Sequence, residues 1–369
     1  MNQLFRWDQI GLFLLALAAG ILPFAVPEVC AAALREGLTL CSGPLLLSLF
    51  PFLVVSRLLI QCPESDLLAL PFRLAAWGIG IRTPCAARVL CIGFLGGFAP
   101  AASAAAQAVR TGQLTAEEAD ALLPACICSG PSFVVLTVGQ RLLGSAELGV
   151  LLFASQITAN YLTAALLNRF AGVRSVKPGS AVSASPAPPR LDEILADAAI
   201  TYCKLCGFIL FFRMLAAGAG ALLPAGAGTL CSILLEVCSG CDLASRTGRW
   251  GSLLCCAALS VQGLSVLLQV RTICPPEMTL RPLYRARMLH LPLSLALFYL
   301  LLPGGEADVF STLPARVLLM RRVPPDCALL VFAVCCMAAC TLRSGIRQVE
   351  QKQMVRNAGG CCINSKTLL

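Results

Sequence analysis

The sequence predicts an all-α, polytopic membrane helix bundle with about 8–11 apolar segments. Its residues are 58% hydrophobic and only 13% charged, and the mean hydropathy is +0.82. A soluble domain normally carries about 25% charged residues. The apolar runs are long and lack strict alternation, which favours membrane helices over barrel strands.

The candidate spans follow from these runs, because a helix needs roughly 20 apolar residues to cross a bilayer. Span 67–81 is short and contains Arg73, so we expect it to be interfacial or tilted. The spans cover residues 10–27, 38–60, 67–81, 86–109, 119–140, 146–170, 198–223, 226–244, 250–271, 288–303 and 325–343.

The first run leaves two interpretations open. Arg6 could serve as a thin n-region of a signal peptide, with Ala31–Ala33 as a small-residue cleavage zone. Asp8 weakens the positive charge that such a peptide needs. In a multi-pass protein we expect an uncleaved first helix instead.

Residues 171–190, rich in Pro, Ser, Ala and Gly, predict a flexible linker between two membrane halves. Its charges are all basic, so we expect the linker and the basic C-terminus to be cytoplasmic. The predicted order is an N-terminal membrane helix (1–37), a first half (38–170), the linker (171–192), a second half (193–290), C-terminal helices (291–343) and a basic tail (344–369).

Counting the runs predicts an interrupted or re-entrant segment in the second half. Three apolar runs separate the linker from another basic segment, 271–287, which we also expect to be cytoplasmic. An odd number of crossings cannot return the chain to the same side. The segment 226–244, interrupted by Ser239 and Gly240, is the natural candidate. Three later residues depart from this scheme, Arg316, Arg321 and Arg322.

Glu236 lies within that segment and is the only charged residue between Arg213 and Asp242. A carboxylate in an apolar span usually faces a bundle interior or a water-filled cavity. The alternative is a glutamate at a helix end that reaches headgroup water. The small residues after it can leave helical geometry, as ion and substrate sites in transporters often do.

Further breaks predict a related arrangement in the first half. Gly96 and Gly97 interrupt one run, and Ser129-Gly130-Pro131 interrupts the next. Paired breaks in two halves indicate an internal repeat with a midplane substrate site. Close helix packing through small residues and a simple proline kink are the alternatives.

Buried amides supply candidate hydrogen-bonding groups. Gln262 and Gln269 are seven residues apart and would share a helix face, and Gln156 and Asn160 would do the same in the first half. Such amides either join helices or line a polar path. The predicted substrate-binding set is Glu236, Ser239, Gly240, Gln262, Gln269, Gly96, Gly97, Ser129 and Gly130.

Other patterns argue against enzyme chemistry. Two CxxC pairs, Cys203/Cys206 and Cys238/Cys241, lie in or beside apolar helices, where cysteine usually acts as an inert hydrophobe. His290 is the only histidine, and the sequence has no Walker loop and no HExxH motif. We therefore predict no enzyme activity, no catalytic residue, no metal and no cofactor.

Six motifs occur in order along the chain: LFPFLVVSRLL (49–59), GFLGGF (93–98), GQLTAEEADALL (112–123), SGPSFVVLTVG (129–139), LLEVCSG (234–240) and QGLSVLLQV (262–270). Together they resemble the sporulation integral membrane protein family of spore-forming Firmicutes. That family is similar to the gate (nucleoside-recognition) domain of nucleoside transporters and ferrous-iron permeases. The first break lacks the basic residue of the family's GYPxGAK, and Ile127-Cys128 replaces its usual Asn pair.

The resemblance implies a multi-pass protein of the cell or forespore membrane that is needed for spore cortex or envelope formation. We expect it to be transporter-like and to move an unidentified small solute. The alternative is a scaffold that recruits spore-envelope machinery without transport. Besides the lipid bilayer, a second copy of the chain is a candidate partner. Nucleic acid is not, because the net charge of +9 resides mainly in loops.

Overall fold

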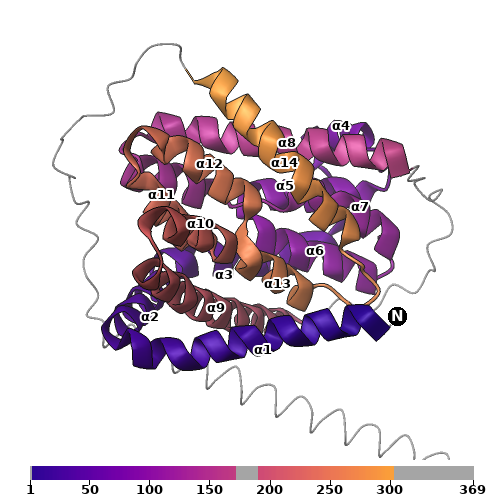
Figure 1. The fold of residues 1–369 in the computed structure, drawn as a ribbon. Helices are drawn as coiled ribbons and strands as arrows, with labels where there is room; N and C mark the ends of the chain where they lie inside the picture. Colours follow the sequence, from indigo (N-terminus) through magenta and orange to yellow (C-terminus); the bar gives the residue numbers. More distant parts are fainter. Residues whose placement is uncertain (1, 172–189, 303–369) are drawn as a thin grey trace, which may run out of the picture.

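The computed structural model describes residues 2–171 and 190–302, and this part is all-α as predicted (Figure 1). It contains fourteen α-helices, one π-helix (η2) and two short 3₁₀-helices (η1 and η3). The predictions for the linker, for span 325–343 and for the basic tail lie outside the described residues.

Before the linker, the chain begins with α1 (Asn2–Ala25), α2 (Pro27–Ser42), α3 (Pro44–Gln61), η1 (Pro63–Asp66) and α4 (Leu70–Gly78). It continues with α5 (Pro84–Gly96), α6 (Phe98–Arg110), α7 (Ala116–Cys126), η2 (Ser132–Leu142) and α8 (Ala146–Ala171). The second half contains α9 (Leu191–Leu222), α10 (Ala225–Leu235), α11 (Val237–Ser245), η3 (Gly248–Trp250), α12 (Gly251–Val261), α13 (Gly263–Ile273) and α14 (Arg281–Leu301).

Four helical stretches are long and apolar enough to cross a membrane, as in a multi-pass membrane protein. Large apolar side chains are also exposed on the outside of the bundle, for example Phe24, Leu74 and Phe170. Such a surface is suited to contact with lipid. The four stretches are Pro27–Leu47, Ala146–Ala171, Leu191–Leu222 and Gly248–Ile273.

Four of the predicted spans are each divided near the middle by a break in the helix. The break between α5 and α6 falls at Gly97, and the one between α7 and η2 covers residues 127–131. In the second half, Glu236 separates α10 from α11 and Gln262 separates α12 from α13. The predicted span 38–60 is divided as well, since α2 ends before Gly43 and α3 begins after it.

One predicted break is displaced. We expected the interruption of segment 226–244 at Ser239 and Gly240, but both are helical residues of α11. Gly240 is needed there for packing, because a Cβ atom on it would lie 2.8 Å from the Cα of Ile233. The chain instead leaves helical geometry at Glu236, whose backbone is extended (φ −150°, ψ 125°).

Side-chain caps fix the positions of α7 and α14. The predicted capping box at Thr115 and Glu118 is present: the Thr115 hydroxyl accepts the Glu118 N–H at 3.1 Å, and the Glu118 carboxylate accepts the Thr115 N–H at 3.2 Å. Further along α7, the Asp120 carboxylate accepts the N–H groups of Thr279 (2.8 Å) and Leu280 (3.1 Å). The start of α14 is therefore attached to α7.

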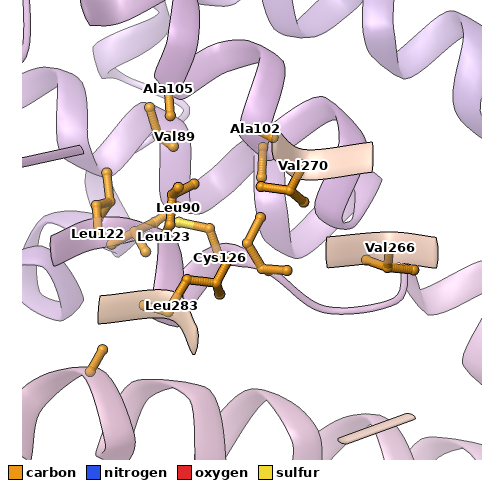
Figure 2. Close-up of a cluster of buried hydrophobic side chains, with 14 of the residues drawn as sticks. Val89, Leu90, Ala102, Ala105, Leu122, Leu123, Cys126, Val266, Val270 and Leu283 are labelled. Atoms are coloured by element: carbon orange, nitrogen blue, oxygen red, sulfur yellow. The ribbon is translucent and has the colours of Figure 1, made fainter. Parts of the chain in front are cut away.

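Both halves share one hydrophobic core (Figure 2). Val89, Ala102 and Leu123 of the first half converge there with Val270 of α13 and Leu283 of α14. Helix α6 is rich in alanine and almost wholly buried. Because small side chains let helix backbones approach closely, α6 can pass through the centre of the bundle.

Candidate functional site at the crossing of broken helices

In the first half, the two breaks cross with their backbones in contact. Gly97 has a left-handed conformation (φ +80°), and a Cβ atom on it would lie 2.7 Å from the backbone nitrogen of Gly130. A Cβ atom on Gly130 would lie 3.4 Å from the carbonyl oxygen of Gly96. Only glycine satisfies both the conformation and the spacing at position 97. The predicted residues Gly96, Gly97, Ser129 and Gly130 are thus brought together.

In the second half, the two breaks cross in a similar way. Gly263 has φ +72°, and a Cβ atom on it would lie 3.0 Å from the backbone nitrogen of Glu236 and from the carbonyl oxygen of Leu235. The extended residue at the end of α10 therefore touches the first residue of α13. Each half contains one crossing, and each crossing depends on one glycine in a left-handed conformation.

Glu236 lies in the interior of the bundle, with 2% of its surface exposed. Its carboxylate accepts the backbone N–H groups of Cys238 at 2.8 Å and Ser239 at 2.7 Å. It is therefore the N-cap of α11, where the helix dipole favours a negative charge. The guanidinium of Arg213 on α9 also interacts electrostatically with it. Both carboxylate oxygens already have backbone donors.

Gln262 connects the two crossings. It is 1% exposed and takes the left-handed conformation (φ +65°), which costs a residue with a side chain more than it costs glycine. Its amide nitrogen donates to the carbonyl oxygen of Leu259 at 2.6 Å and to the Ser129 hydroxyl at 3.4 Å. Its amide oxygen is buried without a hydrogen-bond partner in the described part of the chain.

The spacing of seven residues predicts that Gln262 and Gln269 share a helix face. They do not, because the helix is interrupted at Gln262 itself. The Gln269 amide nitrogen donates to the Ser265 hydroxyl within α13 at 2.9 Å. Its oxygen has no partner among the described residues. The structure therefore places Gln269 on a different helix from the residues before the break.

Arg287 was missed as a site residue, because we assigned it to a basic cytoplasmic segment with Arg281 and Arg285. Those two side chains are exposed, but Arg287 is only 8% exposed. Its guanidinium donates to the carbonyl oxygens of Ile127 at 2.5 Å and Ser260 at 3.3 Å. The described residues provide it with no carboxylate partner.

His290 lies one helical turn after Arg287 and was also missed as a site residue. Its Nδ1 atom is 2.5 Å from the Ser260 hydroxyl, and its Nε2 atom is 3.2 Å from the Gln156 carbonyl oxygen. The ring therefore bridges α12 and α8. The helical period of α14 could have revealed both residues, because Arg287 and His290 recur at the spacing of the buried residues Leu283 and Ser294.

Helix α8 adds a row of buried polar groups beside the first crossing. Gln156, Asn160 and Thr163 follow one another on one helix face, and each is at most 2% exposed. The amide nitrogen of Asn160 donates to the Ile127 carbonyl at 3.3 Å, and that of Gln156 to the Cys256 carbonyl at 3.3 Å. The side-chain oxygen of each of the three lacks a partner in the described residues.

The cysteines of the described residues are free thiols, and most are buried, including Cys91, Cys126, Cys255 and Cys256. Within the same residues, no three His, Cys, Asp or Glu side chains are grouped so that they could hold a metal ion. The groups present at the crossings offer hydrogen bonding by amides, carbonyls and hydroxyls, together with two buried ionisable side chains, Glu236 and Arg287.

No family model, curated protein or solved structure matches this chain.

Proposed function

We propose that this chain is a transporter-like membrane protein that moves a small solute through the region where its broken helices cross. The observation that carries the proposal is the meeting of four helix breaks in the bundle interior, joined by Gln262 and Ser129. Non-helical backbone at membrane depth is tolerated only when it is buried in protein or lines a cavity. Transporters use such discontinuous helices to form midplane binding sites.

We also propose that the two halves are an internal repeat. In each, a helix broken at its centre is followed by a short connection and a second broken helix: α5 to η2 in the first half and α10 to α13 in the second. Each half also has one left-handed glycine at its crossing, although Gly97 belongs to the first broken helix of its half and Gly263 to the second. This matching order supports two related units whose breaks face each other.

The solute would contact polar atoms that the protein itself leaves unsatisfied. The amide oxygens of Gln156, Asn160, Gln262 and Gln269 are buried without partners in the described residues, and such groups are costly unless something binds them. From the predicted site, Ser129 and Gln262 remain the best placed to bind. From the resemblance of its motifs, we propose that this transport serves sporulation, at the cell or forespore membrane.

Cysteine accessibility tests the proposal without knowledge of the solute. Single cysteines at Ser129 and Gln262 are introduced into a cysteine-depleted protein and treated with a charged, membrane-impermeant thiol reagent from each side. Ala105→Cys, in the hydrophobic core on α6, is the control. We expect the site cysteines to react from at least one side while the control stays protected. Equal protection at all three positions would overturn the proposal.

A second experiment separates transport from the scaffold alternative. The Gln262→Ala variant and a deletion of residues 343–369 are each tested for sporulation in the spore-forming host. A transporter is expected to lose function through the buried substitution. If only the tail deletion abolishes sporulation, the scaffold alternative replaces the transporter.

A further inference from the structure

The C-termini of two helices, one from each half, lie beside the same positively charged side chain, that of Arg287. Helix α7 ends at Cys126 with Ile127 as its C-cap, and α12 ends at Val261 with Gln262 as its C-cap. The carbonyls of Ile127 and Ser260 therefore lie in or beside a last turn, where no intrahelical N–H is available. The helix dipole gives such an end a partial negative charge of roughly −0.5. Two such ends together nearly balance one positive charge.

Arg287 supplies that charge. One of its terminal nitrogens donates to the Ile127 carbonyl and the other to the Ser260 carbonyl. The side chain is more than nine-tenths buried, it has no acidic partner in the described residues, and its Nε atom is unpartnered. A buried cation of this kind is stable only if the carbonyl dipoles around it compensate its desolvation.

The position of Arg287 is fixed from both sides. Asp120 on α7 holds the start of α14 through the N–H groups of Thr279 and Leu280. One turn beyond Arg287, His290 contacts Ser260 and the Gln156 carbonyl. The guanidinium is therefore held between the two helix ends by contacts on its own helix.

We propose that Arg287 is a tethered cation that replaces a mobile coupling ion. In ion-coupled transporters, half-helix C-termini and unwound carbonyls bind the coupling cation. Here the guanidinium already lies beside one helix C-terminus from each half. Movement of the helix breaks therefore requires no co-transported metal cation at these carbonyls. The inference rests on the proposed transport function and specifies how its site is regulated.

Chemical rescue of the purified protein in detergent tests the tethered cation. Arg287→Ala is expected to unfold several degrees below the wild type, and millimolar guanidinium, well below denaturing concentrations, is expected to restore much of the loss. Choline chloride at the same ionic strength restores nothing. Arg285→Ala, an exposed position on the same helix, is the control without effect. An Arg287→Ala protein as stable as the wild type would overturn the proposal.

If Arg287→Ala fails to fold, Arg287→Lys and Arg287→Met decide the question. Lysine keeps the charge, whereas methionine keeps much of the length but has no charge. We expect lysine to retain more folded protein than methionine. Equal loss in both variants, or a more stable methionine variant, would show that shape rather than charge matters and would overturn the proposal.

Coupling is read from the labelling rate of the cysteine introduced at Ser129. With Arg287 present, the rate is expected to be the same in sodium, potassium and choline chloride. In the Arg287→Ala variant, the labelling rate is expected to differ between sodium, potassium and choline chloride. A sodium-dependent rate with Arg287 present would overturn the tethered-cation proposal. Protection of the Ser129 cysteine under every condition would instead overturn transport, while the guanidinium rescue still reports on the cation.

Discussion

The two crossings solve one geometric problem with different chemistry. In the first half, Gly97 caps α6 without any side-chain hydrogen bond, and the end of α7 at Ile127 depends on Asn160 and Arg287 from other helices. In the second half, Glu236 caps α11 with its own carboxylate, and Gln262 satisfies the Leu259 carbonyl with its own amide. At the first crossing, side chains from other helices satisfy the backbone carbonyl, whereas at the second crossing, side chains of the crossing itself satisfy much of the backbone.

The close backbone contact at the first crossing predicts that it does not tolerate added side-chain volume. Gly97→Ala places a Cβ atom 2.7 Å from the Gly130 nitrogen and forces alanine to adopt a positive φ. Strain at such a conformation and overpacking each cost roughly 1–3 kcal/mol, so we expect a loss of about 3 kcal/mol or a failure to fold. The yield of folded protein and its denaturation in detergent measure the effect.

Gly112→Ala is the matched control. Gly112 also has a positive φ (+69°), but a Cβ atom there meets open space. Only the conformational cost of about 1 kcal/mol should remain. If the two variants lose equal stability, close backbone contact contributes nothing at the first crossing and the comparison fails.

The second crossing should depend on its carboxylate. Glu236→Ala removes the acceptor from the N–H groups of Cys238 and Ser239, which remain at a buried helix start. Loss of an N-cap typically costs about 0.5–2 kcal/mol. Because the two N–H groups would remain buried without an acceptor, we expect a loss of about 2 kcal/mol. Glu236→Gln, which keeps one acceptor oxygen, should lose about half as much.

The exposed Glu277 provides the charge control for this prediction. Glu277→Ala removes the same charge from a loop, where substitutions usually change stability by less than about 0.5 kcal/mol. Thermal unfolding of the three variants in detergent compares them directly. Indistinguishable stabilities for Glu236→Ala and Glu277→Ala would show that the cap does not hold the second crossing.

The sequence predicted the regions of the helix breaks better than the exact residues at which the helices end. Glycine and proline interrupt helices by their own chemistry, so the breaks near Gly97 and Gly130 were predictable. Glu236 was conspicuous as a lone acid. The exact break at Glu236 was missed because Gly240 serves close packing against Ile233 rather than unwinding.

Two further features could not be predicted from local composition. No propensity places a glutamine in the left-handed conformation, so the break at Gln262 depends on the tertiary contact with the chain near Glu236. The basic charges of segment 271–287 assigned Arg287 to a cytoplasmic segment, because a count of charges does not consider which helix face each residue occupies. Its role requires knowledge that α7 and α12, far apart in sequence, end beside one helix.

A smaller effect should separate strain from hydrogen bonding at Gln262. Gln262→Ala loses the contacts with Leu259 and Ser129 and keeps a Cβ atom in a left-handed conformation. Gln262→Gly loses the same contacts but relieves the strain. We expect the glycine variant to be more stable than the alanine variant by about 1 kcal/mol. The reverse order in a denaturation series would mean that the left-handed conformation is not strained in this setting.

Ser129→Ala should have the smallest effect on stability. Its hydrogen bond across the halves, from Gln262, is long at 3.4 Å and should contribute at most about 0.5 kcal/mol. A double-mutant cycle with Gln262→Ala measures the coupling between the two crossings. Weak coupling in stability, together with a clear loss in sporulation for Ser129→Ala, would indicate that the contact serves movement between the halves. Strong coupling would instead make the contact a structural joint, and the two crossings would then form a single unit.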